Sequence, residues 1–239
     1  MSSGTTAMGA FPRVFLIHGM GRTPVSMWVL ARRLRSAGYE PTLFGYSVTV
    51  ETLESITDRF VERVTATLAD DGSEASWAVV GHSLGNVITR LALPRLPPGF
   101  RCFAMLAPPN RSPVMARTLG DNPIFQIVTR DTGDKLRDPS FFESLPRPSM
   151  PSLVVAGTGG PRAPWLPFAG QPNDTIVSVE ETRLDGVPSV EVPAAHTFLM
   201  NRADVFEIVR SFFEDQGFVP GDPSARPEAE TVESAAQSA

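Results

Sequence analysis

The hydrophobic positions from Phe11 onward alternate between short β-branched runs and longer stretches with helical spacing. Short apolar runs of this kind predict buried strands, and their alternation with helices predicts a mostly parallel sheet with helices on both faces. The fold class expected from the pattern is therefore α/β. The expected strands are RVFLIHG from Arg13, PTLFGYS from Pro41, WAVVG from Trp77, RCFAMLA from Arg101, PSLVVAG from Pro151 and SVEVPA from Ser189.

Helices are predicted between these strands. Pro24 stands near the start of one and Gly38 at its end, a second follows Ser83, and a closing helix is expected to be capped by Asn201. The clearest helix covers residues 52–72, where one apolar stripe faces the sheet. Its members are Leu53, Ile56, Phe60, Val64 and Leu68.

The regular alternation stops between residues 108 and 151, where prolines and the breaks TLGDNP and DTGDKLRDPS predict an excursion with one or two short helices. This segment is interpreted as a cap or lid insertion. We expect a flexible N-terminus at 1–10 and one domain over 11–216. The tail at 217–239 is expected to be disordered because it has little apolar content.

Charge and composition narrow the function classes. The chain has 26 acidic and 21 basic side chains, and its net charge of -5 offers no broad attraction to nucleic acid. No apolar run approaches the ~18 residues that a membrane span needs, and the N-terminus has no signal-peptide pattern. We expect a cytoplasmic protein without stable membrane insertion, and nothing indicates its oligomeric state.

Metal chemistry is not expected. The three histidines stand apart, without the spacing of a metal motif, and no cofactor is implied. The single cysteine, Cys102, lies in the apolar run CFAML and is interpreted as a buried strand residue rather than a nucleophile.

The sequence GHSLG joins the predicted strand at Trp77 to a helix. A sharp strand-to-helix turn brings the residues two before and two after its apex nearly into contact, and Gly81 and Gly85 leave room for this. Ser83 at the apex would have a strained backbone and a hydroxyl that projects above the sheet. These features predict a nucleophilic serine.

A serine nucleophile needs a base and a carboxylate that orients the base. His82 is expected to point to the other side of the turn, and His18 to shape a loop. His196 remains, just past the strand SVEVPA and at the carboxyl edge of the sheet, and is predicted to be the base.

The carboxylate is expected between serine and histidine in the chain. Asp174 is favoured because it follows the loop after SLVVAG and precedes His196 by 22 residues. Asp185 is the rival, although its Asp-Gly pair is typical of a turn. Asp131 and Asp134 are further alternatives.

The oxyanion formed on the substrate needs donors already in place. One is predicted to be the N–H of Leu84, after the nucleophile, and the other the N–H of Met20 in HGMG. Gly19 and Gly21 would allow that loop to approach the substrate closely, or they serve only a tight link between strand and helix.

Three blocks of sequence resemble the α/β-hydrolase superfamily and, within it, the small bacterial triacylglycerol lipases of the compact, lidless type. The blocks are VFLIHGMG, VVGHSLGN and NDTIVSVEETRLDGVPSVEVPAAHTFLM. The resemblance covers most of residues 11–214. It implies that Ser83, Asp174 and His196 are nucleophile, acid and base, with Met20 and Leu84 as oxyanion donors.

The segment from Pro108 to Pro151 is longer than in those compact lipases. It resembles the corresponding stretch of broader lipase and lipid-deacylase relatives, where such a segment crosses the active-site edge. Several aromatic residues here would line an acyl pocket or lid, or belong to the ordinary core. They are Phe125, Phe141, Phe142, Trp165 and Phe168.

The sequence therefore predicts a serine carboxylic-ester hydrolase, an esterase or lipase that acts on small-molecule or lipid esters with apolar acyl groups. Within the three blocks the only basic side chain is Arg183, which favours an acyl chain over a charged group. A thioesterase, amidase or acyltransferase would use the same residues. A non-catalytic binding module on this scaffold is a further alternative.

Overall fold

The structure, a computed structural model, describes residues 11–71, 76–119 and 123–221. The described strands form one six-stranded sheet in the order β2-β1-β3-β4-β5-β6, and every neighbouring pair is parallel. The predicted α/β class is confirmed. The strands are β1 (Arg13–Ile17), β2 (Glu40–Phe44), β3 (Trp77–His82), β4 (Phe100–Leu106), β5 (Ser152–Gly157) and β6 (Ser189–Val192).

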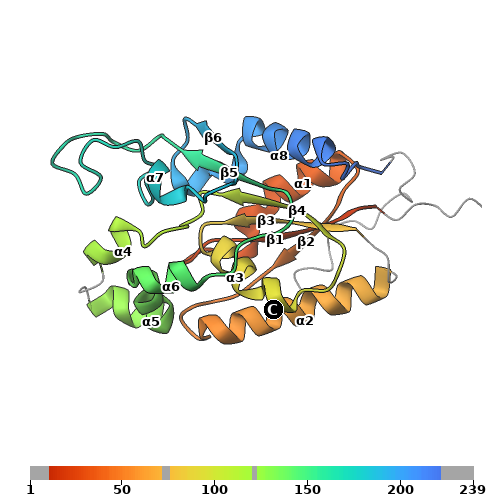
Figure 1. Cartoon of the computed structure of the whole chain (residues 1–239), viewed down its shortest axis with the longest axis horizontal. Helices are drawn as coiled ribbons and strands as arrows, with labels where there is room; N and C mark the ends of the chain where they lie inside the picture. Colours follow the sequence, from red (N-terminus) through yellow and green to blue (C-terminus); the bar gives the residue numbers. More distant parts are fainter. Residues whose placement is uncertain (1–10, 72–75, 120–122, 222–239) are drawn as a thin grey trace, which may run out of the picture.

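The sheet is covered on both faces, as Figure 1 shows. Along β1, Val14 and Leu16 point into one core, while Phe15 and Ile17 point into the other, as the two-residue period of a strand requires. The first core contains side chains of α1 and α8, and the second contains side chains of α2 and α3. These helices are α1 (Trp28–Ser36), α2 (Leu53–Asp71), α3 (Leu84–Ala92) and α8 (Ala203–Asp215).

The strands all run in one direction, so the segments that follow β1, β3, β5 and β6 leave the sheet at the same edge. Short elements follow several strands at this carboxyl edge, where open α/β sheets place their ligands. The remaining short elements of the main fold are η1 (Pro24–Met27), η2 (Leu93–Arg95), α7 (Val179–Thr182) and η3 (His196–Asn201).

The segment 108–151 holds more helix than expected. Its described residues form three helices instead of one or two, because DTGD does not break the chain: Gly133 lies inside a helix of 15 residues. That helix ends before Asp138, which accepts a hydrogen bond from Ser140 N–H and caps the next helix. The three are α4 (Val114–Leu119), α5 (Pro123–Arg137) and α6 (Pro139–Ser144).

Both ends of this insertion are fixed to α3 by the buried guanidinium of Arg90. Its Nη1 donates to Asn110 Oδ1 at 3.1 Å, near the start of the insertion. Near the end of the insertion, Nη2 and Nε donate to the carbonyl oxygens of Leu145 and Pro146, at 2.9 and 3.0 Å. Burial lowers the pKa of Arg90 to about 10, so the side chain is still charged at neutral pH.

The aromatic residues of this region divide into two groups. Phe142 is buried in the core beside α2 and α3, and Phe141 packs against that core. Phe168 is also buried, whereas Trp165 is 84% exposed. The side chain of Phe125 lies outside the described part of the structure.

Two expectations at the C-terminal end are wrong. The N-cap of α8 is Arg202 and not Asn201, whose side-chain oxygen is buried and has no hydrogen-bond partner among the described residues. Order also extends past residue 217, because Phe218 is buried and its carbonyl accepts a hydrogen bond from Tyr39 Oη at 3.1 Å. The expected flexible and disordered ends, 1–10 and the rest of the tail from 222, lie outside the described residues.

Cys102 is buried in the core formed with α1 and α8, and burial raises the pKa of its thiol to about 11. Its interpretation as a buried strand residue is confirmed. Over the described ranges, no helix combines the length and the apolar content that crossing a bilayer would require.

Candidate active site

Ser83 forms the apex of a sharp turn between β3 and α3. Its backbone has φ 53° and ψ −120°, a strained conformation for a residue with a side chain. A Cβ on Gly81 would collide with the Asn86 side chain, and one on Gly85 would lie 2.5 Å from the Ile17 carbonyl oxygen. The turn therefore depends on the two glycines, as the GHSLG spacing predicts.

Asp174 and His196 form a buried hydrogen-bonded pair at the same edge of the sheet. His196 Nδ1 donates to Asp174 Oδ2 at 2.7 Å, and the His196 backbone N–H donates to the Asp174 carbonyl at 2.8 Å. Asp174 is completely buried, and His196 nearly so. Because Nδ1 carries the proton shared with the carboxylate, Nε2 of a neutral His196 is left as the acceptor.

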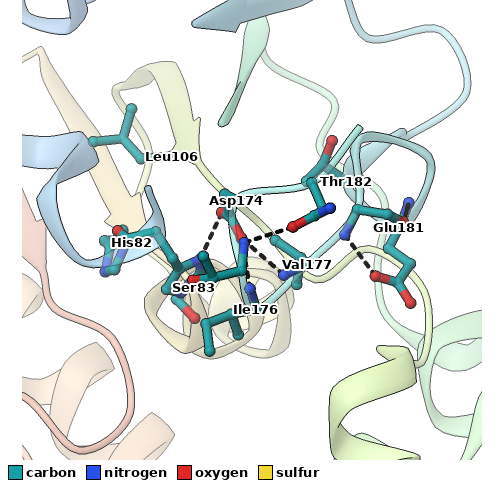
Figure 2. A network of polar contacts seen from close by, with 12 residues as sticks. His82, Ser83, Leu106, Asp174, Ile176, Val177, Glu181 and Thr182 are labelled. Carbon is teal, nitrogen blue, oxygen red and sulfur yellow. Dashed lines mark hydrogen bonds and ion pairs between the residues drawn. The ribbon is translucent and has the colours of Figure 1, made fainter. Parts of the chain in front are cut away.

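The second oxygen of Asp174 is also fixed. Oδ1 accepts hydrogen bonds from the N–H groups of Ile176 at 3.0 Å and Val177 at 2.8 Å (Figure 2). In the sequence, Thr175 stands between Asp174 and these two residues. Its φ is 91°, so this tight loop is strained. The geometry holds the carboxylate in the single orientation in which Oδ2 meets the imidazole.

The other three candidate carboxylates do not contact His196 in the described structure. Asp185 is 77% exposed and lies 3.6 Å from Arg147, in the turn that its Asp-Gly pair predicts. Asp131 accepts a hydrogen bond from the Leu53 N–H at the start of α2. Asp134 is exposed and pairs with Arg137 within α5.

His18 shapes the loop after β1, as expected. Its Nδ1 donates to the Gly19 carbonyl at 2.8 Å, its Nε2 accepts from the Tyr46 N–H at 3.3 Å, and the two rings stack. Burial is the main cause that lowers the pKa of His18. A neutral imidazole with both ring nitrogens in hydrogen bonds therefore fixes the conformation at Gly19.

That loop lies against the nucleophile. A Cβ added to Gly19 would be 3.0 Å from Ser83 Cβ, so Met20, the next residue, follows a backbone in close contact with the serine. Leu84 opens α3, where the first N–H groups have no carbonyl partner within the helix. Among the described backbone hydrogen bonds, neither the Met20 nor the Leu84 N–H is a donor.

The residue before Ser83, His82, brings the nucleophile turn next to His196. The ring of His82, the residue before Ser83, lies 4.7 Å from the ring of His196, and Figure 2 shows His82 and Ser83 adjacent in the same network as Asp174. No hydrogen bond of the described residues joins Ser83 Oγ to His196. In structures without substrate such catalytic hydrogen bonds are often long and tighten only in the complex.

Two residues at this site were not identified from the sequence. His82, expected on the far side of the turn, instead donates from Nε2 to the His196 carbonyl at 3.0 Å. Arg22, one residue past the block VFLIHGMG, donates from Nη2 to the Thr197 carbonyl at 3.0 Å. Arg22 therefore places a cation at this site from just outside the three blocks, and it connects the loop after β1 to the loop that carries His196.

This arrangement is that of a hydrolase, and comparison with known proteins agrees. The alpha/beta hydrolase family model matches residues 14–236, and the chain belongs to that family. No curated protein matches it in sequence.

Several solved structures share the fold at low sequence identity. The mature lipase BlEst2 of Bacillus licheniformis is 15% identical, with a TM-score of 0.67 over 86% of this chain and 91% of that one. The metagenomic carboxyl esterase MGS0156 is 17% identical, with a TM-score of 0.69 over 85% and 76%. A bacterial membrane phospholipase A is 17% identical, with a TM-score of 0.56 over 86% and 79%.

Proposed function

We propose that this protein is a serine carboxylic-ester hydrolase that acts on apolar acyl esters. The observation that carries the proposal is the buried hydrogen bond of 2.7 Å from His196 to Asp174, at the same edge of the sheet as the strained Ser83 turn. An oriented imidazole beside a presented serine is the arrangement that acyl transfer requires. Lipase and carboxyl esterase structures with the same fold are consistent with it.

In the first half of the reaction, Ser83 Oγ attacks the acyl carbonyl carbon and its proton passes to His196 Nε2. Asp174 stabilises the imidazolium that results. The N–H groups of Leu84 and Met20 donate to the oxyanion of the tetrahedral intermediate. The C–O bond to the alcohol then breaks, the alcohol leaves with the proton from His196, and the acyl group remains on Ser83.

In the second half, His196 takes a proton from a water molecule, whose oxygen attacks the acyl-enzyme. The tetrahedral intermediate collapses, and His196 returns the proton to Ser83 Oγ. The products are a carboxylic acid and the free serine, so the cycle needs no cofactor.

Apolar side chains at the carboxyl edge support an apolar acyl group. Ile176 and Phe198, two residues after Asp174 and His196, are 40% and 62% exposed, and Trp165 on the loop after β5 is exposed still further. These side chains follow β5 and β6, at the edge where Ser83 lies. Large exposed apolar side chains in segments at one edge of a sheet are typical of a surface that meets an apolar ligand.

Hydrolysis of p-nitrophenyl esters from acetate to palmitate by wild type and Ser83→Ala tests the proposal. We expect the mutant to lose at least about 10³-fold in kcat while its circular dichroism spectrum is unchanged. A short-chain optimum would assign an esterase and a long-chain optimum a lipase. Full activity in Ser83→Ala would overturn the assignment.

A fluorophosphonate probe, which reacts covalently with activated serines, separates the related reactions. Labelling of wild type but not of Ser83→Ala, without ester hydrolysis at any chain length, would favour a thioesterase, amidase or acyltransferase with the same nucleophile. No labelling together with no hydrolysis would favour a binding module.

A further inference from the structure

His82 touches each of the three segments that carry the proposed chemistry. It is the residue before Ser83, and its Nε2 lies 3.0 Å from the His196 carbonyl oxygen. On the other side of the ring, a Cβ on Gly19 would lie 2.8 Å from Nδ1, so the imidazole packs against the loop before Met20. The side chain is 1% exposed.

The hydrogen bond fixes the protonation of this ring. A carbonyl oxygen only accepts, so Nε2 carries the proton and Nδ1 of the neutral ring has only a lone pair. Nδ1 is buried and has no hydrogen-bond partner in the described structure. Burial, followed by electrostatic interaction with His196, Arg22 and His18, lowers the pKa of His82 well below its usual value.

The backbone of His196 is held from both sides. Its N–H donates to the Asp174 carbonyl at 2.8 Å, and its carbonyl accepts from His82. With the imidazole itself bonded to Asp174 Oδ2, three contacts determine where His196 Nε2 lies relative to Ser83. One of the three comes from the residue directly before the nucleophile.

We propose that His82 is a positioning residue that ties the nucleophile turn to the base: its Nε2–H holds the His196 backbone so that the base lies over Ser83. This role rests on the proposed function of Ser83 and His196. A base displaced by about 1 Å can cost of the order of 10²-fold in rate, so a single backbone contact is enough to matter.

His82 does not itself replace the base. Its Nε2–H is engaged with a carbonyl, and its Nδ1 faces Gly19. A buried ring with a depressed pKa is also a weak proton acceptor near neutral pH. His82 could instead only fill space. A variant that keeps the hydrogen-bond donor but loses the ring distinguishes this role from a positioning role.

The experiment compares His82→Gln, His82→Asn and His82→Leu with wild type. The glutamine amide nitrogen reaches the place of Nε2 and can donate to the His196 carbonyl, whereas the asparagine amide is too short and leucine has no donor. The measurements are kcat and KM on the best p-nitrophenyl ester, the rate of fluorophosphonate labelling, and circular dichroism as the check on folding.

If His82 positions the base, His82→Gln keeps kcat within about threefold of wild type, and the acid limb of its kcat/KM profile is unchanged. His82→Asn and His82→Leu lose about 10- to 100-fold in kcat and in labelling rate, with KM within about twofold. If His82→Leu does not fold, His82→Asn decides.

Folded His82→Asn with kcat near wild type would refute the positioning role, and so would a His82→Gln as inactive as His82→Asn. In both cases wild-type labelling at Ser83 would leave the proposed function standing. Absence of labelling in wild type, with hydrolysis that survives Ser83→Ala, would instead refute the proposed function and the positioning role with it.

Discussion

Asp174 is bonded through both carboxylate oxygens, and this makes Asp174→Asn an informative substitution. The asparagine oxygen can still accept from the Ile176 and Val177 N–H groups, so the loop should fold. Its amide nitrogen, however, would meet His196 Nδ1 and force the wrong tautomer. We expect kcat for ester hydrolysis to fall by roughly 10³- to 10⁴-fold, measured by single-turnover kinetics, with little change in Tm.

Asp185→Asn is the matched control, because Asp185 is an exposed turn residue that pairs with Arg147 at 3.6 Å. Exposed pairs of this kind contribute little to stability. Its kcat and Tm should equal those of wild type. Loss of activity in Asp185→Asn with retention in Asp174→Asn would show that the wrong carboxylate has been assigned.

At the residue scale, the sequence predicted side chains that stand in local patterns and missed those defined by distant contacts. Ser83 is marked by glycines two positions away on either side, and Asp174 and His196 by the strands that they follow. The hydrogen bonds of His82 and Arg22 join residues that are 114 and 175 positions apart in the sequence. No periodicity or spacing reports such contacts, and the catalytic roles themselves stay predictions.

At the scale of elements, the strands were predictable because each is a short apolar run buried in a parallel sheet. The helices of the insertion 108–151 were not predictable, since they depend on tertiary packing. Gly133 is tolerated in α5 because Leu136 and Phe142 pack into the core with α2 and α3. Propensity is a weak guide where such packing decides. The prediction that Asn201 caps α8 was wrong for a related reason, because Asn201 belongs to η3 and its side-chain oxygen is buried.

The insertion as a unit depends on Arg90. Arg90→Met removes the donors to the Leu145 and Pro146 carbonyls and to Asn110 Oδ1, and leaves the Leu145 and Asn110 acceptors buried and the Pro146 carbonyl partly buried. Since each unsatisfied buried group costs about 1–3 kcal/mol, we expect a loss of about 3–5 kcal/mol in the free energy of unfolding in urea. Proteolysis within 108–151 under native conditions should also become faster.

The control for Arg90 is Arg95→Met. Arg95 pairs with Asp58 on the surface, where both side chains are about half exposed. A surface ion pair contributes about 0–1 kcal/mol. A comparable loss of stability in the two variants would mean that the anchoring contacts of Arg90 do not hold the insertion.

At the scale of the whole molecule, the carboxyl edge of the sheet concentrates features that cost stability. Ser83 and Thr175 have positive φ values there, and the imidazoles of His18 and His82 are buried without charge. Such features persist only where the surrounding structure over-determines them. Here the surrounding structure is the pair of cores on the two faces of the sheet, which fix the ends of β1, β3 and β5.

The buried histidines predict how stability depends on pH. Since the pKa values of His18 and His82 are lowered in the folded protein, the unfolded chain binds more protons below about pH 6.5. The free energy of unfolding should therefore decrease as the pH falls from about 6.5, by at most ~1.4 kcal/mol per pH unit for each histidine. Above about pH 7.5 these two histidines should add no pH dependence to the free energy of unfolding.

Urea unfolding of wild type and His82→Gln at pH 7.5, 6.5 and 5.5 isolates one of the two groups. Carboxylates titrate equally in both proteins, so the difference between the slopes belongs to His82, whose charged and titratable neighbours are His196, Arg22 and His18. The variant should lose less stability than wild type between pH 6.5 and 5.5. Equal slopes would mean that His82 takes up a proton in the folded protein, and the neutral ring bonded to the His196 carbonyl would then be wrong.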